Sequence, residues 1–560
     1  MPYSFETDTL ADIAPRSAVF GDHPALGMAD GLSISYRDLD RYTLRCAAFL
    51  DREGIGHGDR VAILSESRPE WGIASLGIAR SGAVSVPILV DFPSAQIVNI
   101  LTHSGSSAIF ASEKTKRKLD QASLEKAGLG GSLKIFPIEA LSAFRAEAEL
   151  EEAAARYVAP KIEPTDIAAI VYTSGTTGLS KGVMLQHRNF MADALACDSV
   201  IRLDGEDILL SILPLAHTYE YTIGFLIPMM SGAQIRYLDR PPSASVLMPA
   251  LAKLRPTIML SVPLVIEKVY RSGVRPSLEK IPLYKVPFLR PLLQRIAGRK
   301  LYASFGGRLR FFGIGGAPVD PEVEAFLLAA RFPYAIGYGL TETAPIIAAS
   351  AVGKTKLRVA GLPIGDADIR IARVEGAERS DIGEIQVRGA MVGPGYYRDR
   401  ARTAEAFTKD GYFRTGDLGS FDRQGRVSVR GRIKTMILGA SGENIYPEEV
   451  EAILNSSPEV VESLVYGDEE GLTALVHLTP ETIAACVKSN VESAEKAAHQ
   501  AADAARLAAE GAAELLERIK REANERLTAF SRIKRMQLQS VPFEKTPTQK
   551  IKRFLYPERE

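Results

Sequence analysis

The sequence predicts an α/β protein, because short apolar strand-like runs alternate with helical runs over residues 31–110. Glycine-punctuated runs between residues 381 and 432 predict antiparallel β structure. An alanine-rich stretch after residue 481 predicts a long helix. These three observations indicate a large α/β region followed by a smaller region that mixes helices and strands.

The first predicted strands are Val61–Leu64 and Ala83–Ile88, and the stretch around Trp71 between them is predicted to be a helix. Residues 112–165 are rich in Lys, Glu and Ala and predict a helix with connecting loops. Ile167–Tyr172 is again a continuous apolar run and predicts a buried strand. Strand–helix–strand alternation of this kind is typical of a largely parallel sheet.

Two later runs, Gly383–Arg388 and Gly425–Arg430, alternate in polarity and predict hairpin-like antiparallel strands. Residues 481–527 contain no proline and one glycine, Gly511, and their apolar side chains recur at helical spacing. They predict one long helix, or two helices broken near Gly511. We expect this helix to pack on a small domain, and a partner-binding or dimerising coiled coil is the alternative.

Composition excludes several classes of protein. The 560 residues carry 68 Lys and Arg against 68 Asp and Glu, so a protein that mainly coats nucleic acid is excluded. Cys46, Cys197 and Cys486 lack the spacing of a zinc or redox motif and are expected to be reduced thiols. No signal pattern opens the sequence, and no apolar run approaches the roughly 20 residues that span a bilayer. We therefore expect a cytoplasmic protein.

The strongest local motif follows the strand that ends near Tyr172. Glycines let backbone N–H groups converge on an anion, hydroxyls donate hydrogen bonds and lysine adds charge. This composition suits the β- and γ-phosphates of ATP, but it is not a Walker A loop, because Ser180 stands where glycine is required. The phosphate-binding residues that we predict are Thr173, Ser174, Gly175, Thr176, Thr177, Gly178 and Lys181.

A competing pattern overlaps this loop. Gly178–Gly182 matches the Gly-x-Ser-x-Gly nucleophile elbow of hydrolases, which places a reactive serine on a strand-to-helix turn. That hypothesis needs Ser180 as nucleophile and a downstream histidine, for which His217 and His477 are candidates. The five-residue match is weaker than the longer phosphate-loop signal.

Six further motifs follow in order: Leu213-Pro-Leu-Ala-His217, Gly315-Gly-Ala-Pro318, Gly337-Tyr-Gly-Leu-Thr-Glu-Thr343, Tyr412-Phe-Arg-Thr-Gly-Asp-Leu418, Gly431-Arg-Ile-Lys434 and Pro547-Thr-Gln-Lys-Ile-Lys-Arg553. From about residue 30 to 556 the chain resembles the adenylate-forming superfamily of acyl-CoA synthetases, firefly luciferase and adenylation domains. It looks most like bacterial long-chain fatty-acid–CoA ligases. The resemblance implies a domain of α/β subdomains plus a small distorted β-barrel over residues 1–431. A mobile α+β domain would follow over residues 432–560, with the helical insertion at about 481–527.

The resemblance also implies a function. ATP, with Mg²⁺, would convert a long-chain fatty acid to an acyl-adenylate, and coenzyme A would then accept the acyl group. One alternative is a fatty-acyl–AMP ligase that delivers the acyl group to an acyl-carrier protein. A second alternative, from another class, is a catalytically silent binding protein with the same fold.

The nucleotide site implied by the resemblance draws on several motifs. The loop would hold the pyrophosphate of ATP, Thr341 would contact the α-phosphate and Glu342 would bind Mg²⁺. Asp417 would accept hydrogen bonds from both ribose hydroxyls, with Arg432 as a further donor. Small residues would let the flat adenine approach the backbone, and the walls of this pocket would be Gly315, Gly316, Ala317, Tyr338 and Gly339.

The resemblance also implies roles for three residues outside the nucleotide pocket. Lys550 would bridge the carboxylate and the α-phosphate, where one cation offsets two repelling anions. His217 would lie at the mouth of the acyl pocket. Lys434 would be the hinge about which the C-terminal domain turns between the two half-reactions, bringing residues 437–447 toward the thiol.

One stretch has a strongly biased charge. Between Lys268 and Arg310 the sequence has eleven Lys and Arg residues against one acid, Glu279, with leucines, prolines and Phe288 interleaved. We interpret it as a solvated basic face or as a peripheral contact with the anionic inner face of a membrane.

Overall fold

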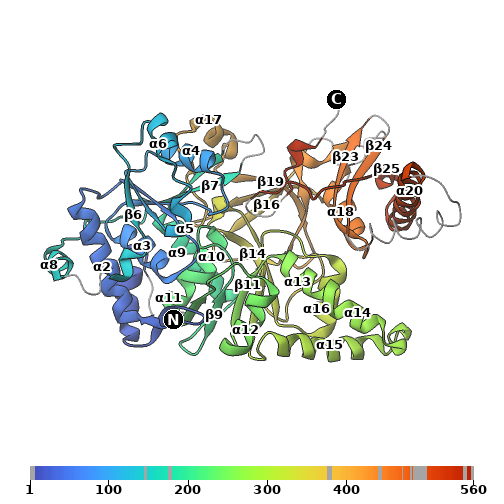
Figure 1. Ribbon diagram of the computed structural model, residues 1–560, viewed down its shortest axis with the longest axis horizontal. Helices are drawn as coiled ribbons and strands as arrows, with labels where there is room; N and C mark the ends of the chain where they lie inside the picture. The colour runs from blue at the N-terminus through green and yellow to red at the C-terminus, as the bar shows by residue number, and fades with distance from the viewer. Residues whose placement is uncertain are drawn as a thin grey trace.

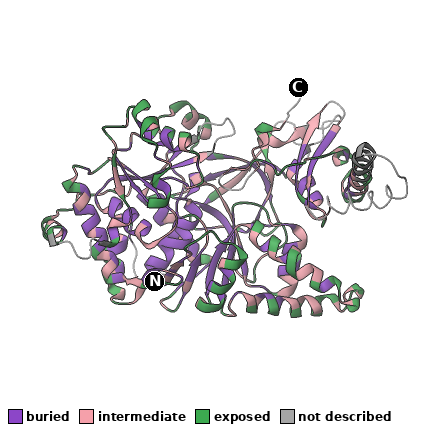
Figure 2. Cartoon of the chain, viewed as in Figure 1, coloured by how far each residue is buried: buried purple, intermediate pink, exposed green. Residues whose placement is uncertain are grey.

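The computed structural model of the protein describes residues 7–143, 148–174, 180–374, 381–438, 444–468, 471–479, 482, 501–546 and 551–556 (Figure 1). Over these residues the fold is mixed α/β, as the sequence predicts, with a nine-stranded and a seven-stranded sheet at its centre. Buried residues gather along these two sheets, and a separate buried core lies in the C-terminal part of the chain, as Figure 2 shows. No helix in the described part of the chain combines the length and apolarity needed to cross a membrane.

The seven-stranded sheet confirms the predicted strand–helix–strand alternation. Its first strands pair in parallel, and helix α3 (Pro69–Arg80), with Trp71 buried, connects two of them. Helices α2 (Tyr36–Arg52), α4 (Ser94–Ser104) and α9 (His187–Ala196) belong to the same half of the molecule. In sheet order the strands are β18 (Gly395–Tyr396), β8 (Ser180–Gln186), β7 (Ile167–Ser174), β4 (Val84–Pro87), β3 (Arg60–Leu64), β5 (Ala108–Ala111) and β6 (Lys134–Pro137).

The nine-stranded sheet holds the middle of the chain. Helix α10 (Thr218–Tyr221) runs through a π-helical turn, Thr222–Leu226, into α11 (Ile227–Ser231) after β9. Helices α12 (Ala244–Leu254), α13 (Pro263–Val269) and α16 (Pro321–Ala330) alternate with later strands. In sheet order the strands are β15 (Leu362–Pro363), β14 (Ile346–Ser350), β13 (Tyr334–Gly339), β12 (Phe311–Ile314), β11 (Ile258–Ser261), β9 (Ile208–Ser211), β10 (Gln234–Tyr237), β1 (Pro24–Met28) and β2 (Ser33–Ser35).

The predicted antiparallel strands form a four-stranded sheet, and the small distorted barrel implied by the resemblance is not closed among the described residues. The sheet is open, and its strands in order are β16 (Asp368–Ala372), β17 (Gly383–Arg388), β19 (Phe413–Phe421) and β20 (Val427–Arg432). Its apolar face carries Ile385 and Phe413 and packs on Ile347 of β14. Because the large sheet already covers this face, the small sheet need not close on itself to bury it.

We call the described residues from 444 onward the C-terminal lobe. Strands β23 (Val460–Asp468), β24 (Gly471–Leu478) and β25 (Ile533–Leu538) form its sheet, with α18 (Pro447–Asn455) packed on β23. Helix α20 (Ala501–Arg526) continues through Gly511 and packs Leu516, Ile519 and Ala523 into the core of this lobe. The predicted single helix is therefore confirmed over these residues, and residues 483–500 lie outside the described part.

Polar contacts join the C-terminal lobe to the rest of the molecule. The Glu449 carboxylate on α18 lies 3.4 Å from the Arg358 guanidinium and 3.5 Å from that of Arg430. The Arg275 guanidinium donates to the backbone carbonyl of Ser456 at 3.3 Å. Each of these ion-paired side chains is about one-third to one-half exposed, so each pair contributes roughly 0–1 kcal/mol.

Candidate active site

Asp417, Tyr338 and Arg432 meet where β13 lies beside the small sheet. The Tyr338 hydroxyl donates to Asp417 Oδ2 at 2.9 Å, and Arg432 Nε lies 2.8 Å from Oδ1. Asp417 and Arg432 are register partners on β19 and β20, so strand pairing sets their spacing. Burial and the Asp417 charge raise the pKa of Tyr338, which keeps its hydroxyl a donor. The carboxylate is thus buried and held in one orientation.

A second charged group forms around Glu342, in the single helical turn Thr341–Thr343 after β13. Lys181 on β8 lies 2.6 Å from Glu342 Oε1, and the Tyr396 hydroxyl donates to the same oxygen at 2.9 Å. Burial alone would raise the pKa of Glu342, but the Lys181 ammonium outweighs it and the pKa lies below the ordinary value. A buried carboxylate is therefore kept ionised beside the end of the predicted phosphate loop.

Small residues occupy the chain next to the Asp417 and Glu342 groups. Gly315 and Gly316 follow β12, and Gly316 has a φ of +86°, which a residue with a side chain rarely adopts. A Cβ added to Gly339 would lie 1.8 Å from the Pro345 carbonyl oxygen, so only glycine fits there. Gly316 and Ala317 are exposed, which leaves room for a flat ring to approach the chain.

His217 is the N-cap of helix α10, and its Nδ1 accepts a hydrogen bond from the Tyr219 backbone N–H at 3.2 Å. The Ser67 hydroxyl holds the preceding loop on both sides, donating to the Leu213 carbonyl at 3.1 Å and accepting from the Leu215 amide at 3.0 Å. The loop that leads to His217 is therefore tied to the segment that follows β3.

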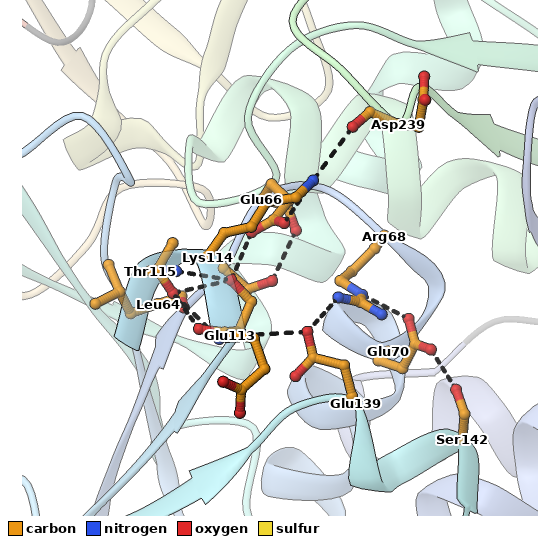
Figure 3. A network of polar contacts seen from close by, with 12 residues as sticks. Leu64, Glu66, Arg68, Glu70, Glu113, Lys114, Thr115, Glu139, Ser142 and Asp239 are labelled. Atoms are coloured by element: carbon orange, nitrogen blue, oxygen red, sulfur yellow. Dashed lines mark hydrogen bonds and ion pairs between the residues drawn. The ribbon is translucent and has the colours of Figure 1, made fainter. Parts of the chain in front are cut away.

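A network of charged side chains surrounds that segment (Figure 3). Arg68 bonds Glu70 at 2.8 Å and Glu139 at 2.6 Å, and Lys114 lies 3.4 Å from Glu66. These residues follow the carboxyl ends of neighbouring strands, where open α/β sheets form ligand crevices. The network therefore ties together the loops that follow β3, β5 and β6.

The predicted Lys550 and the loop residues 175–179 lie outside the described residues. The described residues on either side of Lys550 are held in place. Lys545 forms an isolated antiparallel β-bridge with Ile551, and its ammonium lies 2.5 Å from the Glu462 carboxylate. Arg553 donates to Glu451 Oε1 at 2.6 Å. Burial raises the pKa of Glu451 to about 7, although the Arg553 charge opposes the shift.

Residues 14–397, more than half of the chain, match the family model described as AMP-binding enzyme. The chain belongs to the AMP-binding enzyme family. A long-chain-fatty-acid–CoA ligase, FadD15, of Mycobacterium bovis is 32% identical over 71% of this chain and 69% of its own length. Human long-chain-fatty-acid–CoA ligase 1 is 29% identical over 70% of this chain and 61% of its own.

Solved structures share the fold of this AMP-binding enzyme. ATP-bound MatB from Rhodopseudomonas palustris is 23% identical, with a TM-score of 0.74. The match covers 97% of this chain and 98% of the MatB chain. MenE from Bacillus subtilis, in complex with an acyl-adenylate, is 21% identical over 98% of both chains, also with a TM-score of 0.74.

The structure of the AMP-binding enzyme overturns the hydrolase hypothesis. Ser180 begins strand β8, which pairs antiparallel with β7, so no strand-to-helix turn presents a nucleophile there. His477 lies on β24 of the C-terminal lobe, where its ring bonds the Gln539 carbonyl at 2.9 Å. The phosphate-loop interpretation stays a prediction for the residues that are not described.

Two groups of this AMP-binding enzyme were not predicted from sequence. Tyr396 follows a Gly-Pro-Gly run and reaches Glu342 through the pairing of β18 with β8. Glu220 is fully buried, accepts from the Ser211 hydroxyl at 2.5 Å, and its Oε2 has no partner among the described residues. In the sequence, Glu220 lies three residues after His217, next to a predicted site residue.

Glu220 should make the stability of the AMP-binding enzyme fall as pH rises. Burial raises the pKa of Glu220 to about 8, whereas the unfolded carboxyl titrates near 4.5. Between these values the native state holds a proton that the unfolded state lacks, so the free energy of unfolding decreases with pH and levels off above about 8. Urea unfolding of Glu220→Gln at several pH values should show a flatter profile than wild type. Glu525→Gln, at an exposed site, should keep the wild-type slope, and parallel profiles for Glu220→Gln and wild type would contradict the prediction.

Proposed function

We propose that this protein is an AMP-forming fatty-acid–CoA ligase that acts on long-chain fatty acids with ATP, Mg²⁺ and coenzyme A. The observation that carries the proposal is the buried Asp417, held by Tyr338 and Arg432 beside the ionised Glu342. Relatives that cover about 70% of this chain carry the name long-chain-fatty-acid–CoA ligase, which favours this substrate class.

The residues around Asp417 fit the nucleoside half of ATP. A buried carboxylate can accept hydrogen bonds from two adjacent hydroxyls, and the fixed orientation of Asp417 suits the paired hydroxyls of ribose. Arg432 adds a donor at the same edge. The adenine ring would lie against the small residues Gly315, Gly316 and Ala317, with Tyr338 and Gly339 completing the pocket.

The residues around Glu342 fit the phosphates and a hard cation. An ionised carboxylate beside phosphate oxygens is a suitable ligand for Mg²⁺, and we assign Glu342 that part. When bound, Mg²⁺ would neutralise charge on the phosphates. Lys181, with the loop Thr173–Gly178, would hold the leaving pyrophosphate, and Thr341 would contact the α-phosphate.

The acyl group would lie beside helix α10. Tyr219 faces the backbone just after β12: a Cβ added at Gly315 would lie 3.2 Å from its ring. His217 lies two residues before Tyr219, at the end of the loop that Ser67 holds, and would mark the mouth of the acyl pocket. The fatty-acid carboxylate would then attack the α-phosphate to give acyl-adenylate and pyrophosphate.

Two half-reactions would use two positions of the C-terminal domain, residues 432–560, relative to residues 1–431. Lys550 would bridge the carboxylate and the α-phosphate during adenylation. Rotation about Lys434 would then withdraw Lys550 and let the thiol of coenzyme A attack the acyl carbonyl, with AMP as leaving group. The weak contacts of Glu449 with Arg358 and Arg430 are compatible with such a rotation.

The test is AMP release by the purified full chain with ATP and Mg²⁺, using acids from acetate to oleate, with and without coenzyme A. Coenzyme A-dependent release that rises with acyl chain length is the expected result. Adenylate formation without coenzyme A-dependent turnover would overturn the ligase assignment in favour of delivery to an acyl-carrier protein. No AMP with any acid would overturn adenylation itself.

A further inference from the structure

We propose that residues 275–304, which we call the arm, dock on the surface of a membrane that contains anionic lipids. The arm comprises α14 (Arg275–Glu279), a 3₁₀ turn (Pro282–Lys285) and α15 (Arg290–Ser304). Figure 1 shows it projecting at the lower edge of the molecule, away from the central sheets. The proposal deepens the proposed function, because long-chain fatty acids partition into membranes.

The arm exposes several large apolar side chains, although apolar groups are disfavoured on a surface that contacts only water. Four of them lie within fourteen residues and range from less than half to four-fifths exposed: Leu283 (56%), Phe288 (80%), Leu292 (56%) and Ile296 (44%). Single exposed leucines scattered over a surface are ordinary in soluble proteins, but four large exposed apolar side chains on one projecting element favour an interaction site.

Helix α15 separates two faces. Gly298 and Leu301 are buried, and Leu293 packs with them against the core formed by α12 and α16. Leu292 and Ile296, one turn apart, lie on the opposite, exposed face. The helix is therefore anchored by one face, and the other presents apolar side chains to the outside.

Basic side chains are interspersed with these apolar side chains along the arm. Six basic residues of the arm are exposed, and none is in an ion pair with a carboxylate of the described residues: Lys280, Lys285, Arg290, Arg295, Arg299 and Lys300. Residues 280–310 contain no Asp or Glu. Two basic residues just beyond the arm differ: Arg271 pairs with Asp320, and Arg310 pairs with Asp207.

An anionic bilayer is the partner that takes both kinds of side chain at once. Its headgroups attract the cations, while Phe288 and the leucines can enter the boundary with the acyl chains. Nucleic acid would use the cations alone and gives no reason for the exposed Leu292 and Ile296. Because the chain as a whole has no net charge, the attraction is local and would orient the molecule with the arm toward the lipid.

The experiment is flotation of the purified full chain with vesicles of phosphatidylcholine, with or without about one-third phosphatidylglycerol. Wild type should float with the anionic vesicles and be released as salt is raised. Arg295→Glu with Arg299→Glu should weaken binding at least tenfold, since each removed charge is expected to cost about fivefold. Phe288→Ser should weaken it severalfold without changing the salt dependence. Lys409→Glu with Arg423→Glu, exposed residues elsewhere, is the matched control and should bind like wild type.

Failure of this proposal is distinguishable from failure of the proposed function. AMP release from a short acid in the absence of vesicles should be the same for wild type and the arm variants, which also shows that they are folded. No flotation of wild type, or equal flotation of all variants, would overturn membrane docking. Self-association that the arm variants abolish, without flotation, would assign the surface to a second copy of the chain.

Discussion

Replacing Lys550 by alanine should reduce acyl-adenylate formation by at least a hundredfold. The reaction brings a carboxylate against the negatively charged α-phosphate, and a cation placed between them lowers the barrier by offsetting their repulsion. Removing one preorganised donor to developing charge typically costs about 10²–10³ in rate. The measurement is ATP–pyrophosphate exchange with the preferred fatty acid, which reports the first half-reaction alone.

The same variant should retain the second half-reaction, because Lys550 is proposed to leave the site before the thiol attacks. Acyl transfer from supplied acyl-adenylate to coenzyme A should stay within a few-fold of wild type. Lys552→Ala, whose ammonium lies 3.3 Å from Glu544, is the matched control and should leave both steps unchanged. Undiminished pyrophosphate exchange in Lys550→Ala would remove Lys550 from the catalytic site.

Replacing Glu342 by glutamine should lower kcat/KM for ATP by at least a hundredfold and raise the Mg²⁺ concentration needed for activity. The amide has nearly the same shape but carries no charge, so it is a poor Mg²⁺ ligand and leaves Lys181, 2.6 Å away, without a charged partner. The measurement is kcat/KM for ATP over a Mg²⁺ titration.

Glu384→Gln is a closely matched control. Its side chain is as buried as that of Glu342, 9% exposed in each, and it also pairs with a basic residue, Arg414, at 3.2 Å. It lies on β17, where we assign no ligand, so its effect should be on stability and not on the Mg²⁺ dependence. Equal Mg²⁺ profiles for Glu342→Gln and Glu384→Gln would contradict the assignment of Glu342 as the ligand.

The sequence predicts the buried strands well and the peripheral ones poorly, for a physical reason. Strands such as β3 and β7 are covered on both faces, so they are continuous apolar runs that stand out in the sequence. Strand β6 (Lys134–Pro137) is half-exposed at the edge of its sheet, whereas its sequence, within residues 112–165, predicts helix and loop. An edge strand depends on its neighbour β5 more than on its own pattern.

The candidate site divides in the same way. The motifs identify Tyr338, Asp417 and Arg432 individually, and the structure shows that they touch. Tyr396 could not be found from spacing, because its contact with Glu342 depends on the pairing of β18 with β8 rather than on a local motif. The sequence alone likewise does not predict whether the small sheet closes into a barrel, since closure depends on whether β14 covers the apolar face of the sheet.

If the C-terminal domain turns about Lys434 as we propose, the ion pairs of Glu449 with Arg358 and Arg430 would make the position of that domain depend on ionic strength. Both must break if the C-terminal domain turns about Lys434, and both are exposed enough to be screened by salt. Because the Debye length shortens from about 30 Å at 0.01 M to about 8 Å at 0.15 M, added salt weakens this orientation relative to any that lacks the pairs. The fraction of molecules with the C-terminal domain in this orientation would therefore be larger in dilute buffer than in physiological salt.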